Sequence, residues 1–160
     1  MEINTTILAV QPFLKGLPER HLELLVGLAM PVEFEAGKQI FKEGSPANRF
    51  YLLTSGEVAL ESSSNERDDE RKPMLIETLG PGDVLGWSWL FPPYYWHFDA
   101  RAVTPAKALF FYGSRLREHC AHDHELGYEL MQRTAEVVIG RLQATRERLL
   151  EQNKNLQPYV

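Results

Sequence analysis

The segment GDVLGWSWLFPPYYWHFDARAV, residues 82–103, concentrates side chains that could bind a ligand. It holds three Trp, two Tyr and two Phe around a Pro-Pro pair, together with His97 and Arg101. Aromatic faces can stack on flat ligands, and a histidine or an arginine supplies a polar handle for a charged group. The segment therefore indicates either a ligand site or an aromatic core.

Other candidate reactive groups have simpler interpretations. The glycine-rich run from Gly80 to Gly86 lacks the Lys and following Ser or Thr of a phosphate loop, so it predicts a turn. The run HCAHDH has the composition of a metal site, but such residues at a polar helix junction are more often on the surface. That alternative would use His119, Cys120, His122 or His124. Neither a nucleophile paired with a base nor histidines on paired strands can be assigned. We therefore expect no enzyme activity, no metal and no cofactor.

Composition limits the classes of partner. The 160 residues fit one domain, and a formal net charge of -5 gives no general attraction to nucleic acid. The basic run RLQATRERLLEQNK alternates positive with acidic residues, as on a solvated helix face. One cysteine and the absence of any long apolar run predict a cytoplasmic protein without a disulfide or a membrane segment.

The elements that must position the aromatic segment are mostly short strands. A short amphipathic helix is predicted over 17–30. Apolar and polar residues then alternate in short runs over 31–62, 74–86 and 100–113, which are broken by turn residues. The polar stretch 62–73 predicts an exposed hairpin loop. Many short strands with turns at such intervals are typical of a sandwich or jelly roll.

The C-terminal region is predicted to be helical. Residues 114–124 indicate one short helix or turn, and residues 125–155 indicate a continuous helix. A helix of that length spans about 45 Å, more than a small domain needs for its own cover. We therefore expect part of it to pack on a second copy of the chain. The apolar stripe permits two seams, and its members are Leu126, Leu130, Val137 or Val138, Leu142, Leu149 and Leu156.

The order of these elements resembles the cyclic nucleotide-binding domain family, which includes catabolite activator protein-like regulators. The motifs that carry the resemblance are Gly37, FKEG at 41–44, YLL followed by Ser55-Gly56, and GPGD at 80–83 followed by Gly86. The resemblance covers residues 12–155. It implies a mainly β fold, with a double-stranded β-helix jelly roll and a short N-terminal helix over 1–124, and a long dimerisation helix over 125–160.

The resemblance also implies where a cyclic nucleotide would bind. After the GPGD turn, family members have a cassette that holds the cyclic phosphate at a helix N-terminus. A Glu directly after a Gly holds the ribose, and an Arg and a Ser or Thr about ten residues later hold the phosphate. Here Gly86 is followed by Trp87, and the two later positions fall on Trp96 and His97. Both polar anchors are missing, which argues against tight binding of cyclic AMP.

Several interpretations of this cassette stay open. A diverged sensor would stack a flatter or less charged ligand on the aromatic rings, and its site would comprise Gly86, Trp87, Ser88, Trp89, Leu90, Trp96, His97 and Arg101. In a structural module the aromatic rings would simply fill the old pocket. Arg101 could replace the missing arginine, although strand alternation predicts that it faces away from the site. Some family members hold heme, for which His97 or His119 could be an axial ligand.

Regulation is the class of function that the resemblance implies. Family members that bind DNA carry a helix-turn-helix domain after the long helix, and we expect no DNA-binding element in this chain. We expect a non-enzymatic regulatory or sensory homodimer which, if it senses a small molecule, shifts the orientation of the long helix. The alternatives are a purely structural dimer with a filled pocket and the ligand domain of a transcription regulator.

Overall fold

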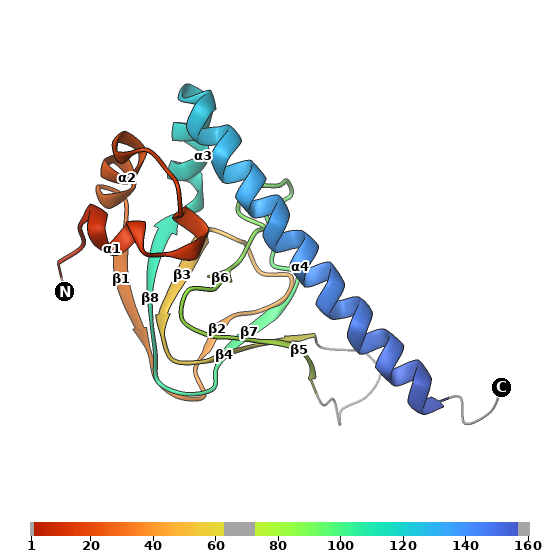
Figure 1. The fold of residues 1–160 in the computed structure, drawn as a ribbon. Coiled ribbons are helices and arrows are strands. Elements are labelled where there is room, and N and C mark those ends of the chain that lie inside the picture. Colours follow the sequence, from red (N-terminus) through yellow and green to blue (C-terminus); the bar gives the residue numbers. More distant parts are fainter. Residues whose placement is uncertain (1, 63–72, 157–160) are drawn as a thin grey trace.

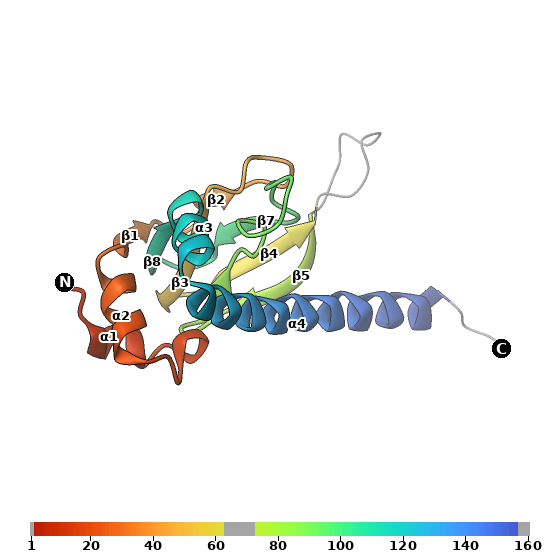
Figure 2. The same cartoon turned by 90° about the horizontal axis from the view of Figure 1, so that it is seen from above.

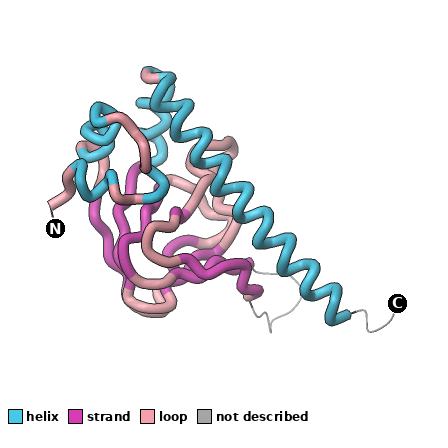
Figure 3. The backbone as a smooth tube through the Cα atoms, viewed as in Figure 1, coloured by secondary structure: helices cyan, strands magenta, loops and turns pink. Residues whose placement is uncertain are grey.

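The computed structural model describes residues 2–62 and 73–156. Two four-stranded sheets, with strand orders β1-β8-β3-β6 and β2-β7-β4-β5, wrap into a jelly roll (Figure 1). All of their strand pairs are antiparallel. Figure 3 shows the strands gathered in one body, with the short helices at one end and the long helix alongside. The predicted fold class is therefore confirmed.

The strands lie where the alternation of apolar and polar residues predicts them. A tight turn at Gly56, with φ of +86°, joins the third strand to the fourth, and a Cβ there would lie 2.3 Å from the Pro105 carbonyl oxygen. Only glycine fits this position. The strands are β1 (Met30–Phe34), β2 (Gln39–Phe41), β3 (Arg49–Ser55), β4 (Val58–Ser62), β5 (Met74–Leu79), β6 (Val84–Leu85), β7 (Asp99–Ala102) and β8 (Ala106–Tyr112).

The polar stretch between β4 and β5 is only partly described. The two strands pair antiparallel with Ser62 opposite Met74, as expected for a hairpin. The loop that we predict between them falls on residues 63–72, which lie outside the described residues.

The N-terminal helices differ from the prediction. The single helix expected over 17–30 is shorter, because Gly27 caps it and Met30 already pairs with Phe110 in the sheet. A short helix before it was not predicted; its N-cap residue Asn4 accepts a hydrogen bond from the Ile7 N–H at 2.9 Å. The helices are α1 (Thr5–Ala9), the 3-10 turn η1 (Pro12–Leu14), α2 (Glu19–Val26), α3 (Gly113–His122) and α4 (His124–Leu156).

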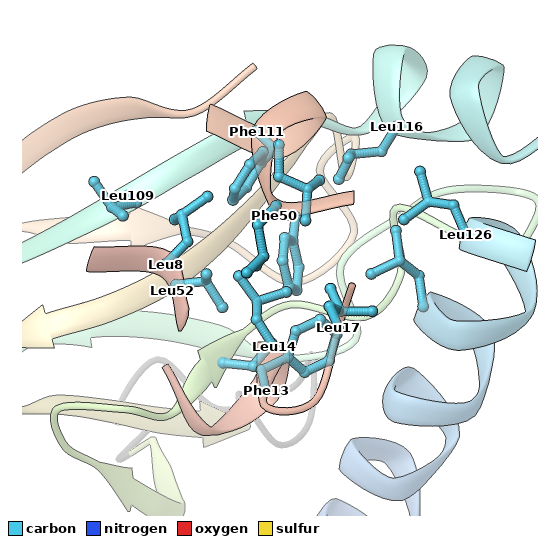
Figure 4. Close-up of a cluster of buried hydrophobic side chains, with 14 of the residues drawn as sticks. Leu8, Phe13, Leu14, Leu17, Phe50, Leu52, Leu109, Phe111, Leu116 and Leu126 are labelled. Atoms are coloured by element: carbon cyan, nitrogen blue, oxygen red, sulfur yellow. The ribbon is translucent and has the colours of Figure 1, made fainter. Parts of the chain in front are cut away.

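Strands β3 and β8 separate two hydrophobic cores. Because side chains alternate along a strand, Phe50 and Leu52 of β3 face the helices, whereas Tyr51 and Leu53 face the inside of the barrel. We call the first cluster the helical core; it is built from Leu8, Phe13, Leu14, Leu17, Leu22, Leu25, Phe50, Leu52, Val84, Trp89, Leu109, Phe111, Leu116, Leu126 and Leu130 (Figure 4). The second, the barrel core, includes Phe41, Tyr51, Leu60, Leu85, Trp96 and Phe110.

Helix α4 has two parts with different surroundings. Leu126 and Leu130 are buried in the helical core. Further along, Leu142 is 66% exposed and Leu149 is 58% exposed. Figures 1 and 2 both show this end of α4 continuing past the barrel; Figure 2 views it from above. The predicted apolar stripe is therefore divided between the chain's own core and an open surface.

Candidate functional site

The cassette segment, which we define as residues 86–98 between β6 and β7, runs as turns rather than as the expected helix. Its second half lies on the turn between β2 and β3. The Ala47 N–H donates to the Tyr94 carbonyl at 2.7 Å, and the Trp96 N–H donates to the Ser45 carbonyl at 2.9 Å. The Gly44 N–H completes the contact by donating to the Trp96 carbonyl at 2.9 Å. These bonds fix the backbone on both sides of the Trp96 side chain.

The indole of Trp96 fills the mouth of the barrel. Its ring stacks on Phe41 with centroids 3.8 Å apart and planes 10° from parallel, and only 5% of the residue is exposed. Gly86, with φ of +93°, allows this approach, because a Cβ there would lie 2.4 Å from the Trp96 ring. The cavity left beside the indole measures about 10 Å³. That is room for one water molecule at most.

The rim of this pocket carries the half-buried Trp87, the buried Ser88 and the exposed His97. The Trp87 and His97 rings stack with centroids 4.4 Å apart. A hydrogen bond of 2.8 Å joins Ser88 Oγ and His97 Nδ1, so the imidazole proposed as a polar handle already has a partner within the chain. The structure thus brings Gly86, Trp87, Ser88, Trp96 and His97 together.

Trp89 and Leu90 lie apart from this group. Trp89 is fully buried in the helical core, where its ring lies 5.4 Å from that of Phe50. Leu90 packs against the same core. Gly113 at the start of α3 allows the approach, because a Cβ there would lie 2.9 Å from the Trp89 Cβ. Within one short segment, Trp89 and Trp96 therefore enter different cores.

Arg101 lies on the outer face of β7. Its neighbours Ala100 and Ala102 face the barrel core, so alternation turns the guanidinium outward. The guanidinium Nε donates to Glu61 Oε1 at 3.1 Å, and this hydrogen bond, with the charge of Glu61, raises the pKa of Arg101. The structure does not bring Arg101 to the pocket as a replacement for the missing arginine.

A different arginine reaches the pocket, and the sequence interpretation missed it. Arg141 belongs to the basic run assigned to a solvated face of α4, yet its side chain is only 11% exposed. It donates to Glu77 Oε2 at 3.1 Å and to the Val84 carbonyl at 2.6 Å, and it lines the small cavity beside Trp96. Burial lowers the pKa of this guanidinium, against the opposing charges of Glu77 and Asp83. The helical spacing in the sequence does not show that the Arg141 side chain is largely buried while Arg146 is exposed.

The histidine-rich run at the end of α3 does not form a metal group. Across residues 2–62 and 73–156, no three His, Cys, Asp or Glu side chains converge as metal ligands. His122 Nδ1 instead lies 2.8 Å from the Glu118 carbonyl oxygen, one helical turn away. Burial raises the pKa of the Cys120 thiol, which disfavours its thiolate.

None of the described helices is both long and apolar enough to cross a membrane.

Comparison with known proteins gives related regulators. In Mycobacterium tuberculosis, the CRP-like cAMP-activated global transcriptional regulator is 27% identical over 145 residues. The alignment covers 91% of this chain and 61% of that regulator, so the chain spans about three fifths of its length. A match to human cGMP-dependent protein kinase 2 is 32% identical but covers only 9% of the kinase.

Solved structures give the same result for the fold. A candidate cyclic nucleotide-binding protein from Geobacter metallireducens superposes with a TM-score of 0.77 at 32% identity, covering 88% of this chain and 98% of that one. The regulatory subunit of a cAMP-independent protein kinase A from Trypanosoma brucei has the same fold, with a TM-score of 0.64 at 23% identity over 82% of this chain and 45% of that one. Residues 31–123 match the family named cyclic nucleotide-binding domain. The chain belongs to the cyclic nucleotide-binding domain family.

Proposed function

We propose that this chain is a non-enzymatic regulatory module that has diverged from cyclic AMP binding and works as a homodimer through α4. The observation that supports the divergence from cyclic AMP binding is the position of Trp96. Its indole is stacked on Phe41 inside the barrel mouth and leaves a cavity of about 10 Å³. A cyclic nucleotide would have to displace it.

Two free-energy terms oppose such displacement. Moving a large aromatic side chain from the core into water costs about 1.5–3 kcal/mol. A nucleotide phosphate would then lack the expected arginine, since Trp96 and His97 occupy the family's anchor positions, and a lost charge-assisted pair costs about 2–5 kcal/mol more. Together these terms argue for a pocket that is filled by the chain itself.

The exposed face of α4 supports a dimer with a second copy. Large apolar side chains recur on the side of the helix that is turned away from the barrel: Tyr128, Met131, Ile139, Leu142 and Leu149. Tyr128, Ala135, Leu142 and Leu149 follow one another at heptad spacing, as in a two-stranded coiled coil. Such a stripe would otherwise face water along a helix of 33 residues. A second copy presents the matching stripe by symmetry.

A sensor for a different ligand is the second candidate, and the rim favours it. Trp87 and Phe91 form an aromatic edge with centroids 6.3 Å apart, next to the stacked His97. A flat molecule without a phosphate could rest on this edge without replacing Trp96. In either case the relative named as a transcriptional regulator supports a regulatory role in the cytoplasm.

The decisive experiment is a titration with cyclic AMP and cyclic GMP, read by tryptophan fluorescence and by calorimetry. The three Trp of the chain all lie in the cassette segment, so no label is needed. We expect no saturable change up to about 1 mM nucleotide, equivalent to binding weaker than about -4 kcal/mol. Saturation at micromolar nucleotide would overturn the filled-pocket proposal.

Light scattering tests the dimer with a matched pair of variants. Leu142→Glu places a charge in the centre of the apolar stripe and is expected to give monomers at micromolar protein. Gln143→Glu adds the same charge at the next, exposed position of α4 and should leave the dimer intact. A wild-type monomer at micromolar concentration would remove this part of the proposal.

A further inference from the structure

Arg141, in the middle of α4, forms hydrogen bonds with the barrel. Open grooves lie under the helix on both sides of this point. One, of about 540 Å³, is lined by Val137 and Gly140 among others, and the next, of about 460 Å³, by Ala144 and Arg148 among others. Between them Arg141 reaches across to β5 and β6. Helix α4 therefore passes over two grooves on the side of the barrel. Between these grooves, the hydrogen bonds of Arg141 hold it on the barrel.

The two ends of α4 are held differently. Before Arg141, Leu126 and Leu130 anchor the helix in the helical core. After Arg141, the described side chains are mostly exposed, and Gln152 Nε2 donates a hydrogen bond to Met74 Sδ of β5 at 3.6 Å. A thioether is a weak acceptor. Within the described residues, Arg141 therefore makes the strongest polar contact between the barrel and this part of α4, which also packs against β5.

Arg141 also touches the wall of the filled pocket. It lines the same small cavity as Trp96. Its acceptor Val84 lies two residues before Gly86, whose backbone packs directly against the Trp96 ring. Movement of the indole would therefore open space beside the guanidinium and relax the backbone that carries its acceptor.

We propose that Arg141 is a latch that holds the distal half of α4 on the barrel only while Trp96 fills the pocket. The proposal rests on the proposed function, in which Trp96 occupies the pocket and α4 forms the dimer. A latch of this kind can open, because the Glu77 side chain is 33% exposed and can be rehydrated when the guanidinium leaves. The apolar anchor around Leu126 has no such alternative.

Hydrogen exchange along α4 tests the latch. All variants carry Leu142→Glu, so that protection by a dimer does not contribute. Arg141→Ala is expected to speed exchange of the amides beyond residue 141 by about 10- to 100-fold, while the amides of 126–137 keep their protection. Arg146→Ala, an exposed arginine of the same helix, is the control and should change neither part. Wild-type exchange in Arg141→Ala would overturn the latch.

Conservative substitution separates a latch from a general loss of stability. Arg141→Lys keeps the charge but has no fork with which to reach Glu77 and Val84 together. We expect it to restore only part of the protection beyond residue 141. Full restoration by Lys would show that charge alone holds the helix and would overturn the two-acceptor latch.

The coupling to Trp96 needs its own test. Trp96→Ala should loosen the distal half of α4 as Arg141→Ala does, and the double variant should loosen it no further. Indole added to Trp96→Ala should restore the protection by refilling the space. If Trp96→Ala fails to fold, Trp96→Phe gives a smaller cavity for the same comparison.

Wild-type protection in these pocket variants, or purely additive effects, would overturn the coupling. These readouts contain no nucleotide and no dimer, so they stand apart from the tests of the proposed function.

Discussion

Trp89 and Trp96 come from the same short segment but stabilise different parts of the molecule. Trp89 is fully buried among the helices, next to Phe50 and α3. Trp96 lies in the barrel mouth, stacked on Phe41 and close to a residual cavity. Trp89 joins the cassette segment to the helices, and Trp96 joins it to the barrel core.

The difference shows that residue type does not decide between core and site. Both rings are large, flat and equally able to stack on a ligand. Their roles are set by the two faces of β3, because Phe50 faces the helices and Tyr51 faces the barrel. The segment crosses from one side of this sheet to the other between the two tryptophans.

The largest expected effect comes from Trp89→Ala. Truncation of a fully buried Trp at the junction of the segment and the helices should lower the free energy of unfolding by about 4–5 kcal/mol. Trp89→Phe is the control: it keeps most of the packing and removes an indole N–H that has no described hydrogen-bond partner. Urea denaturation measures both. A loss below about 1 kcal/mol for the alanine variant would contradict the assignment of Trp89 to the helical core.

Trp96→Ala should have a smaller effect on stability. The vacated space lies next to a half-exposed rim and can take up water, so we expect a loss of about 3 kcal/mol, at the low end for a buried aromatic residue. The helical core should keep its native Trp89 fluorescence. If Trp96→Ala destabilised the protein more than Trp89→Ala, the comparison of the two rings would be reversed.

Gly86→Ala should disturb the packing of Trp96 and leave that of Trp89 unchanged. The new Cβ would meet the Trp96 ring at 2.4 Å, in a backbone conformation that disfavours L side chains, and strain of this kind costs about 1–3 kcal/mol. Gly80→Ala, with open space around its Cβ, should be close to neutral. The cost at Gly86 should shrink in the Trp96→Ala background, because the steric part disappears. Equal costs in both backgrounds would show that only the backbone conformation matters.

The smallest expected effect is a loss of stability at acid pH, caused by protonation of Asp123 next to the helical core. Asp123 at the corner of α3 and α4 accepts hydrogen bonds from the Leu126 N–H and from Arg20, and these lower its pKa. Its folded pKa thus lies below the unfolded value of about 3.9. The stabilisation is therefore complete above that value and is lost as the pH falls through the folded pKa. Asp123→Asn should flatten the dependence of unfolding free energy on pH in this acid range, measured by urea denaturation. An unchanged slope would remove Asp123 as the cause.

Much of the fold could be predicted from local patterns. Alternation and turn residues predict the strands, and the absence of proline predicts α4, because these signals act over a few residues. The short α1 and η1 were missed, since their residues carry little periodicity. The site was predicted only in part: Trp87, Ser88, Trp96 and His97 do meet, but Trp89 and Leu90 belong to the helical core.

The sequence by itself determined the jelly roll and the long helix, and it predicts that Trp87, Trp96 and His97 stand where the family has polar anchors. Those are properties of residue types at fixed spacings. Only the tertiary structure decided that Trp96 closes the barrel on Phe41 and that Arg141 arrives from α4, far along the chain. The physical reason is that burial and hydrogen-bond partners come from segments that are distant in sequence, so no local pattern encodes them.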